Sequence, residues 1–213
     1  MAKKKRKKSR ASKSKPDPRD QIIDAALKLA LERGWRRLAM TEIADAAGLT
    51  KAELSRQFSS KPAILNGFQR RTDNAVLALG PADGSSTSDR LFDVLMRRFD
   101  ALQPHRDAIR VIVRDIACDP LAALCQGPHV MCSMASMLEA AGLKVGGIGG
   151  AVRTKGLAVI YMRTLCVWMD DDSADQSKTM AVLDRGLARA ECLAGLLCPR
   201  AGAKSAAPET KTA

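Results

Sequence analysis

The amino-acid sequence predicts an all-α protein, and three observations point to this class. The chain is 46% apolar but only 3% aromatic, whereas strands favour aromatic and β-branched residues. Apolar residues recur at helical spacing through most segments. Residues that start helices, and glycines that end them, stand at the segment boundaries. We therefore expect helices along the whole folded part of the chain.

The first helix is expected to follow Asp17-Pro18, with aspartate as the N-cap and proline at the first helical position. Gly34 is expected to end it, because glycine readily adopts the left-handed conformation of a helix end. Trp35 and Leu38 would pack the following turn into the core. The buried stripe of this supporting helix is expected to be Ile22, Ile23, Ala26, Leu27 and Ala30.

Residues 41–65 predict two short helices joined by a tight turn, with a third helix starting behind them. Thr41 is expected to cap the first short helix, residues 42–47, because its hydroxyl can accept an N–H of the first turn. Gly48 would supply the turn that ends it.

The second short helix, residues 51–57, opens with the capping-box pair Thr50 and Glu53. Ser60 can cap the third helix, with Pro62 in its first turn, where the missing N–H costs nothing. The segment therefore has the capping and turn residues of a helix–turn–helix.

The apolar residues decide which side of this unit faces inward. The expected core positions are Ile43, Ala47, Leu49, Leu54 and Phe58. The open side of the second helix then presents Lys51, Ala52, Ser55, Arg56 and Gln57. Such a helix suits the major groove of DNA, where arginine and glutamine read base edges. An ordinary helical hairpin with a solvated polar face is the alternative interpretation.

Residues 19–68 resemble the N-terminal domain of TetR-type transcriptional regulators. The matching positions keep the same order and spacing: 19–23, Gly34, 41–44, 47–50, Phe58, Ser60, Lys61 and Leu65. The resemblance implies an all-α, TetR-like fold, in which an N-terminal three-helix helix–turn–helix domain is followed by a helical ligand-binding and dimerisation domain.

The resemblance also implies which residues contact DNA. The helix over residues 51–57 would be the recognition helix, and Thr41 and Lys61 would lie at phosphates. The expected DNA-binding residues are Thr41, Thr50, Lys51, Ala52, Ser55, Arg56, Gln57 and Lys61. Ser55 departs from the family pattern, which usually has a tyrosine that touches the DNA backbone.

The net charge of +12 is unevenly distributed along the chain. Residues 1–19 hold ten Lys or Arg and one Asp, and so account for +9 of it. This stretch repels itself and lacks apolar periodicity, so residues 1–16 are expected to be disordered. The tail could attract DNA phosphate, lie on an anionic lipid surface, or serve as a solubilising arm without a partner.

No apolar run approaches the roughly 20 residues that span a bilayer, and no apolar core follows the basic N-terminus as in a secretory signal. We therefore expect a cytoplasmic protein without a transmembrane segment. An enzyme is not expected, because the sequence shows no Ser–His–Asp or Cys–His arrangement and no phosphate-binding loop. No cofactor is expected either.

The six cysteines form no C-x-x-C pair, and the two histidines lack ligand spacing with them. We expect them to be small buried hydrophobic residues and not metal ligands: Cys118, Cys125, Cys132, Cys166, Cys192 and Cys198. Pro120 and the Gly127-Pro128 pair are expected to interrupt any helix through the first three. The three acids at 170–172 are expected to be solvated in a turn.

Further helices are expected in the second half, with Ser88 capping the first of those after the break at 80–87. Their expected ranges are 63–79, 88–102, a helix after Pro104, a short one at 120–125, then 128–141, 151–169 and 174–197, with a flexible loop at 142–150. The resemblance implies that the last two helices form an interface with a second copy. The faces expected there are Leu157, Ile160, Tyr161, Thr164 and Trp168, then Leu183, Leu187, Ala190 and Ala194.

A ligand pocket is expected in this second half, with plain core packing as the alternative. Its expected lining is Phe92, Leu95, Met131, Met134, Leu138, Tyr161, Met162 and Trp168. Methionine is unbranched and adapts to loosely shaped ligands. No charged residue is evidently reserved for the interior, so we expect an apolar or aromatic ligand.

A second resemblance concerns the end of the chain. Residues 156–161, Thr164, Trp168, 171–173, Asp175, Thr179 and 183–185 are similar to the end of the ubiquinone-biosynthesis lipid-binding proteins. Those share the TetR fold, bind isoprenoid lipids and assist a hydroxylase. They also carry a further amphipathic helix, whereas nothing apolar follows Leu197 here.

Together these observations predict four regions: a basic tail at 1–16, the DNA-binding domain at 17–66, the ligand-binding and dimerisation domain at 67–198, and a disordered tail at 199–213. The expected function is that of a ligand-responsive repressor that binds a palindromic operator as a homodimer. The alternative is a lipid-binding accessory protein of ubiquinone biosynthesis that no longer reads DNA.

Overall fold

The computed structural model describes residues 17–197, with side chains through residue 192. Within this range every element of secondary structure is a helix, so the predicted all-α class is confirmed. The tails expected at 1–16 and 199–213, and Cys198, lie outside the described residues. The elements are α1 (Pro18–Arg33), α2 (Met40–Ala46), α3 (Lys51–Gln57), α4 (Lys61–Leu77), α5 (Thr87–Leu102), the 3-10 helix η1 (Gln103–His105), α6 (Arg106–Ala117), α7 (Pro120–Ala140), α8 (Gly147–Met169) and α9 (Ser177–Leu197).

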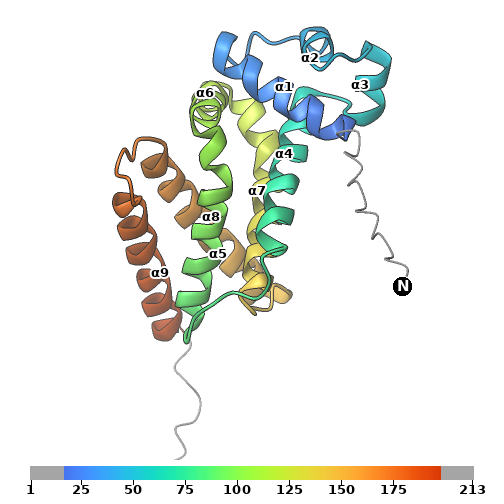
Figure 1. The fold of residues 1–213 in the computed structure, drawn as a ribbon. Helices are drawn as coiled ribbons and strands as arrows, with labels where there is room; N and C mark the ends of the chain where they lie inside the picture. The colour runs from blue at the N-terminus through green and yellow to red at the C-terminus, as the bar shows by residue number, and fades with distance from the viewer. Residues whose placement is uncertain (1–16, 198–213) are drawn as a thin grey trace, which may run out of the picture.

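The helices form two parts that share one element (Figure 1). The short helices α2 and α3 pack on α1 at one end of the molecule, and α5 to α9 form a bundle beside and below them. Helix α4 packs on α1 and also on α5 and α7, so it belongs to both parts. The domain boundary expected after residue 66 therefore falls within a continuous helix.

Local capping interactions fix the start of α1 and α3 as the sequence predicts. The Asp17 carboxylate accepts the N–H of Arg19 at 2.9 Å. The capping box at α3 is complete, because Thr50 Oγ1 accepts the Glu53 N–H at 3.2 Å and Glu53 Oε2 accepts the Thr50 N–H at 2.8 Å. Gly48 has a φ of +67° and turns the chain between α2 and α3.

The predicted cap of α2 is wrong. The helix starts at Met40, so Thr41 lies in its first turn and is exposed. The N-cap is Ala39, whose N–H is accepted by the Glu42 carboxylate at 2.8 Å. The same carboxylate pairs with Arg33 at 3.0 Å. A first-turn carboxylate fixed in this way satisfies the helix end, so no hydroxyl cap is needed.

Helix α7 is also different from the prediction, because it continues through Pro128 without interruption. Pro120 lies in its first turn, and the Asp119 carboxylate caps it by accepting the N–H groups of Leu121 and Ala122 at 3.1 Å. A proline inside a helix removes one hydrogen bond. Packing against α4, α5 and α8 offsets this loss, since the helix buries Ser133, Met134, Met137 and Leu138.

Two further helix starts differ from the prediction. Ser86, and not Ser88, caps α5, because its hydroxyl accepts the Asp89 N–H at 3.0 Å while Asp89 accepts the Ser86 N–H. Helix α8 begins at Gly147, so the loop expected at 142–150 is shorter.

The cysteines are not core residues. Among the residues whose side chains are described, Cys118, Cys125, Cys132, Cys166 and Cys192 are all exposed free thiols. The prediction of burial was wrong because larger apolar side chains fill the inward positions of the same helices, for example Met134 on α7 and Leu165 on α8. No described helix is long and apolar enough to cross a membrane.

Some predicted apolar faces are buried as expected, whereas the α8 face expected at a dimer interface is not on the surface. The expected stripe of α1 is buried, as are Ile43, Leu54 and Phe58 of the helix–turn–helix. On α8 the face expected at a dimer interface turns inward instead. The buried members of that face are Leu157, Tyr161, Thr164 and Trp168. The ring of Phe99 on α5 contacts those of Tyr161 and Trp168, with ring centroids 5.6 and 5.7 Å apart.

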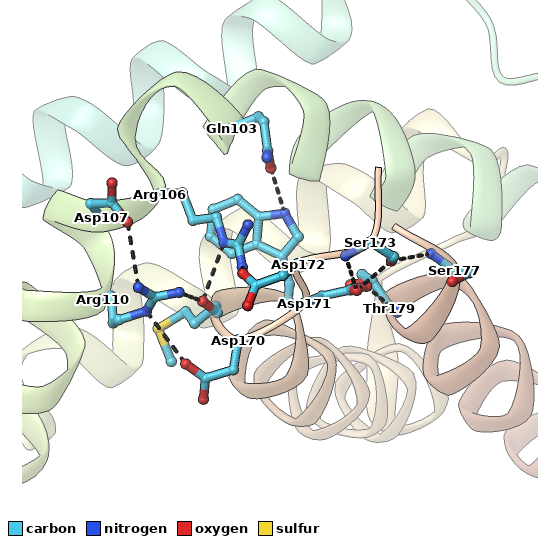
Figure 2. A network of polar contacts seen from close by, with 12 residues as sticks. Gln103, Arg106, Asp107, Arg110, Asp170, Asp171, Asp172, Ser173, Ser177 and Thr179 are labelled. Carbon is cyan, nitrogen blue, oxygen red and sulfur yellow. Dashed lines mark hydrogen bonds and ion pairs between the residues drawn. The ribbon is translucent and has the colours of Figure 1, made fainter. Parts of the chain in front are cut away.

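The corner between α8 and α9 is built on Asp171 (Figure 2). The side chain is 2% exposed, so the expectation of a solvated acid is wrong for this member of the Asp triplet. Its carboxylate accepts hydrogen bonds from the backbone and hydroxyl of both Ser173 and Thr179. Burial opposes ionisation, but these bonds outweigh it and hold the pKa of the Asp171 carboxyl well below its usual 3.8.

We expect Asp171→Asn to lower the free energy of unfolding by about 2 kcal/mol at pH 7. The asparagine NH2 group would face N–H groups that donate to the carboxylate in the original protein. A depressed pKa in the folded state stabilises the fold above pH 3.8, and this contribution is lost as the pH falls. The difference between the two proteins should therefore shrink below about pH 4. Urea unfolding at several pH values measures it.

Asp172→Asn is the matched control, because its carboxylate is mostly exposed and pairs with Arg106 at 3.0 Å. This variant should unfold almost like the original protein at every pH. Equal losses in the two variants would show that the bonds around Asp171 do not stabilise the corner.

Candidate functional site

The open side of α3 is the first candidate site. Leu54 is 0% exposed, and Phe58 directly after the helix is buried, so these two side chains fix α3 on its support. The opposite side is left to solvent. Of the residues predicted there, Lys51, Ala52, Ser55 and Arg56 are exposed and Gln57 is half-buried.

The flanking residues of the predicted DNA-binding set are placed as follows. Thr41 is exposed in the first turn of α2. The Thr50 hydroxyl takes part in the α3 cap and also donates to Glu53 Oε2 at 2.8 Å. Thr50 is thus hydrogen-bonded at the start of α3, where the positive end of the helix dipole and the first N–H groups lie.

Lys61 begins α4 and holds the turn after α1. Its ammonium donates to the carbonyls of Trp35 and Arg36, both at 3.1 Å, and lies 5.6 Å from the centre of the Trp35 ring. Burial lowers the pKa of the Lys61 ammonium, and the nearby Asp115 carboxylate partly offsets this. Two of its three N–H groups are used in these contacts.

The same turn connects the helix–turn–helix to the bundle. Asp115, near the end of α6, accepts the N–H of Arg36 at 2.9 Å. Gly34 adopts a φ of +82° here, and a Cβ added to it would lie 3.5 Å from the Asp115 carboxylate. A displacement of α6 would therefore pull directly on the segment that follows α1.

A cavity of about 540 Å³ within the bundle is the second candidate site. It lies among α4, α5, α6, α7 and α8, and its size is in the range of small-molecule pockets. Its described lining is mainly aliphatic, with these residues prominent: Leu65, Leu102, Ile109, Ile112, Val113, Ile116, Val130, Met131, Ala158, Val159, Met162 and Leu165. An apolar molecule would find few polar groups along most of its wall.

One part of the lining is polar. Arg98 is 2% exposed and forms an ion pair with Asp73 of α4. Asp73 also accepts the Ser133 hydroxyl at 2.9 Å. The Arg98 guanidinium carbon lies 5.3 Å from the centre of the Tyr161 ring, and Gln69 and Gln126 line the same cavity. The expectation that no charged residue is reserved for the interior was wrong.

The structure brings together part of the predicted pocket set. Met131, Tyr161 and Met162 line the cavity. The remaining members do not line it: Leu95, Met134, Leu138 and Trp168 are fully buried in the core, and Phe92 is partly buried against it. Trp168 donates its indole N–H to Gln103 at 3.0 Å.

Sequence reasoning missed the polar lining residues Gln69, Arg98 and Gln126, together with Asp73. Arg98 did have a visible signal, because it interrupts the inward face formed by Leu95, Phe99 and Leu102. A charge on a buried face needs a partner. The partner could not be read from the sequence, since Asp73 lies on another helix.

The two parts define a class of protein: a helix–turn–helix domain joined to a helical bundle with a partly open cavity. Residues 22–67 match the family model described as "Bacterial regulatory proteins, tetR family". The N-terminal domain is thus similar to that of the tetR family, and the described chain has the fold of solved TetR regulators.

The chain is similar to several known regulators. An HTH-type transcriptional activator, FasR of Mycolicibacterium smegmatis, is 33% identical over 109 residues, 49% of this chain and 50% of that protein. The chain thus spans about half the length of this curated relative. A TetR transcriptional regulator from Nitrosomonas europaea has a TM-score of 0.64 at 24% identity, over 83% of this chain and 99% of the other. Thermus thermophilus FadR, a TetR-family repressor solved with lauroyl-CoA, has a TM-score of 0.50 at 18% identity, over 90% and 100%.

Proposed function

We propose that the protein is a transcriptional regulator that reads a palindromic operator with α3 and responds to a ligand in the bundle cavity. The observation that carries this proposal is the two-sided character of α3. Leu54 is wholly buried, while Arg56 and Lys51 are exposed beside the half-buried Gln57. Arginine can pair with guanine and glutamine with adenine in the major groove.

The other predicted contacts have a positioning role in this proposal. Ala52 and Ser55 are small, so the helix backbone can approach the groove closely. Lys51 would contribute charge toward phosphate, and Thr41 and Thr50, at the starts of α2 and α3, would lie at the DNA backbone. Lys61 would donate to a DNA phosphate the third N–H of its ammonium, which neither carbonyl contact uses.

Homodimerisation would place two copies of α3 on one operator, about one DNA turn apart. Two exposed apolar side chains on α8 support it: Ile148 and Val152 lie one helical turn apart and are 87% and 62% exposed. This pair replaces the inward-facing residues expected earlier at a dimer interface. Paired with a second copy, it would be removed from water.

The ligand would act as an inducer of a repressor. It can shift the protein between forms only if it binds one of them more tightly. The cavity is suited to this because α4 and α6 line it and also reach the turn after α1. The chain would therefore release its operator when an apolar molecule fills the cavity.

Titration of the purified protein against DNA from upstream of its own gene, at several salt concentrations, tests this function. We expect binding to this DNA to be at least about a thousandfold tighter than to a scrambled sequence at physiological salt. A steep salt dependence without preference over scrambled DNA would overturn the regulator proposal, because phosphate attraction alone gives that result.

A lipid-binding accessory role of the ubiquinone-biosynthesis type remains the second candidate, and the aliphatic cavity is the observation that favours it. The two functions differ in what the purified protein carries. An isoprenoid lipid extracted from it and identified by mass spectrometry, together with absent operator binding, would favour the carrier.

A further inference from the structure

The cavity has one polar corner, and it is built around Arg98. Among the described lining residues, Arg98 alone is charged. Its guanidinium is held on two sides, by the ion pair with Asp73 and by the face of the Tyr161 ring. Gln69, one helical turn before Asp73 on α4, extends the corner. The guanidinium therefore has two contacts that do not depend on a ligand.

Hydrogen-bonding capacity remains at this corner. Arg98 Nε and Gln69 Oε1 are shielded from solvent, and neither has a hydrogen-bond partner among residues 17–192. Buried polar groups in native proteins nearly always have a partner, in the protein, in water or in a ligand. A ligand atom that accepts a hydrogen bond would satisfy the guanidinium.

The charge balance selects the kind of acceptor. Arg98 and Asp73 neutralise each other, and no further cation belongs to the described lining. A carboxylate or phosphate bound here would leave a net negative charge in a poorly solvated interior, which is costly. A carbonyl oxygen accepts the same hydrogen bond without adding a charge.

We propose that the cavity binds an uncharged amphiphile, an aliphatic chain ending in an ester, thioester or ketone carbonyl, with that carbonyl accepting from Arg98. The aliphatic wall formed by Ile109, Ile112 and Val130 takes the chain. The proposal deepens the ligand response proposed above and rests on it for its regulatory meaning. Binding itself is measurable without DNA.

Four probes of similar chain length distinguish the possible head groups of the ligand. Equilibrium dialysis of the full chain against methyl decanoate, the corresponding S-methyl thioester, decanoate and undecane measures the affinity of each at one pH above 7. Both carbonyl probes should bind about tenfold or more tightly than undecane, because a hydrogen bond to a charged donor is gained. They should also exceed decanoate. A difference between the two carbonyl probes shows which ester type is preferred.

The role of Arg98 is tested by removing the ion pair as a unit. The double variant Arg98→Met with Asp73→Leu leaves no unpaired charge in the interior. It should bind the carbonyl probes and undecane within about threefold of each other, because the donor is gone. Arg97→Met is the matched control on the same helix, since Arg97 pairs with Asp93 and does not line the cavity. It should keep the original preference.

Three results would overturn the proposal: decanoate as the tightest probe, undecane as tight as the carbonyl probes, or no binding of any probe. The comparison among probes on the unaltered protein decides this even if the double variant does not fold. Operator binding measured on the same sample separates failure of this proposal from failure of the regulatory function.

Discussion

Replacing Arg56 and Gln57 together by alanine is expected to abolish the preference for the operator while leaving the fold intact. Both side chains lie on the open side of α3, away from the buried Leu54 that fixes the helix. Each base contact of this type contributes about 1–3 kcal/mol of discrimination. We therefore expect specific binding to fall by about a hundredfold or more. Competition between operator and scrambled DNA measures this loss.

The control must match the loss of charge. Arg70→Ala removes one positive charge from an exposed position on α4, as the double variant does from α3. It should weaken binding to both DNAs alike and leave their ratio unchanged. If the double variant instead kept its full operator preference, α3 would not be the recognition helix.

Asp73→Ala is expected to cause the largest loss of stability among the variants considered. It leaves the guanidinium of Arg98, which is almost completely buried, without its counter-charge. Breaking a buried ion pair from one side costs about 3–5 kcal/mol, whereas replacing both members by apolar residues is often neutral. The double variant Asp73→Leu with Arg98→Met should therefore recover most of the loss. Urea unfolding at a fixed protein concentration measures both.

Asp24→Ala provides the comparison with an exposed pair. Asp24 lies 2.8 Å from Arg71 on the protein surface, and its side chain is largely in water. Surface pairs contribute about 0–1 kcal/mol. A loss of similar size in Asp73→Ala would mean that water reaches the Arg98 guanidinium and that the charge is not desolvated.

The helix–turn–helix part could be predicted closely because its determinants are local. Asp17, Gly34, Gly48 and the Thr50 capping box act within a few residues of themselves, so their effect is visible in the sequence. The cap of α2 failed for the opposite reason. Glu42 is fixed partly by Arg33, which belongs to the preceding helix.

The bundle was less predictable because distant packing decides it. Pro128 predicts a break, but contacts of α7 with α4 and α8 keep the helix whole. The cavity required five helices to be placed in space, and its charged corner joins residues of α4 and α5. Periodicity shows which face of a helix is apolar, but it does not show which helix lies opposite.

Helix α4 runs from the turn after α1 to the region of the cavity. Asp73 pairs with Arg98 of the cavity lining, and Lys61 lies at the turn after α1, twelve residues or about 18 Å away along the same helix. A tilt of about 5° around Asp73 would carry the far end sideways by about 1.5 Å. In a symmetric pair the two ends would swing in opposite directions and change their separation by about 3 Å, against a DNA repeat of about 34 Å. A small shift of one ion pair by a ligand carbonyl would thus become a larger displacement of the two recognition helices. Their separation would then no longer match the helical repeat of DNA.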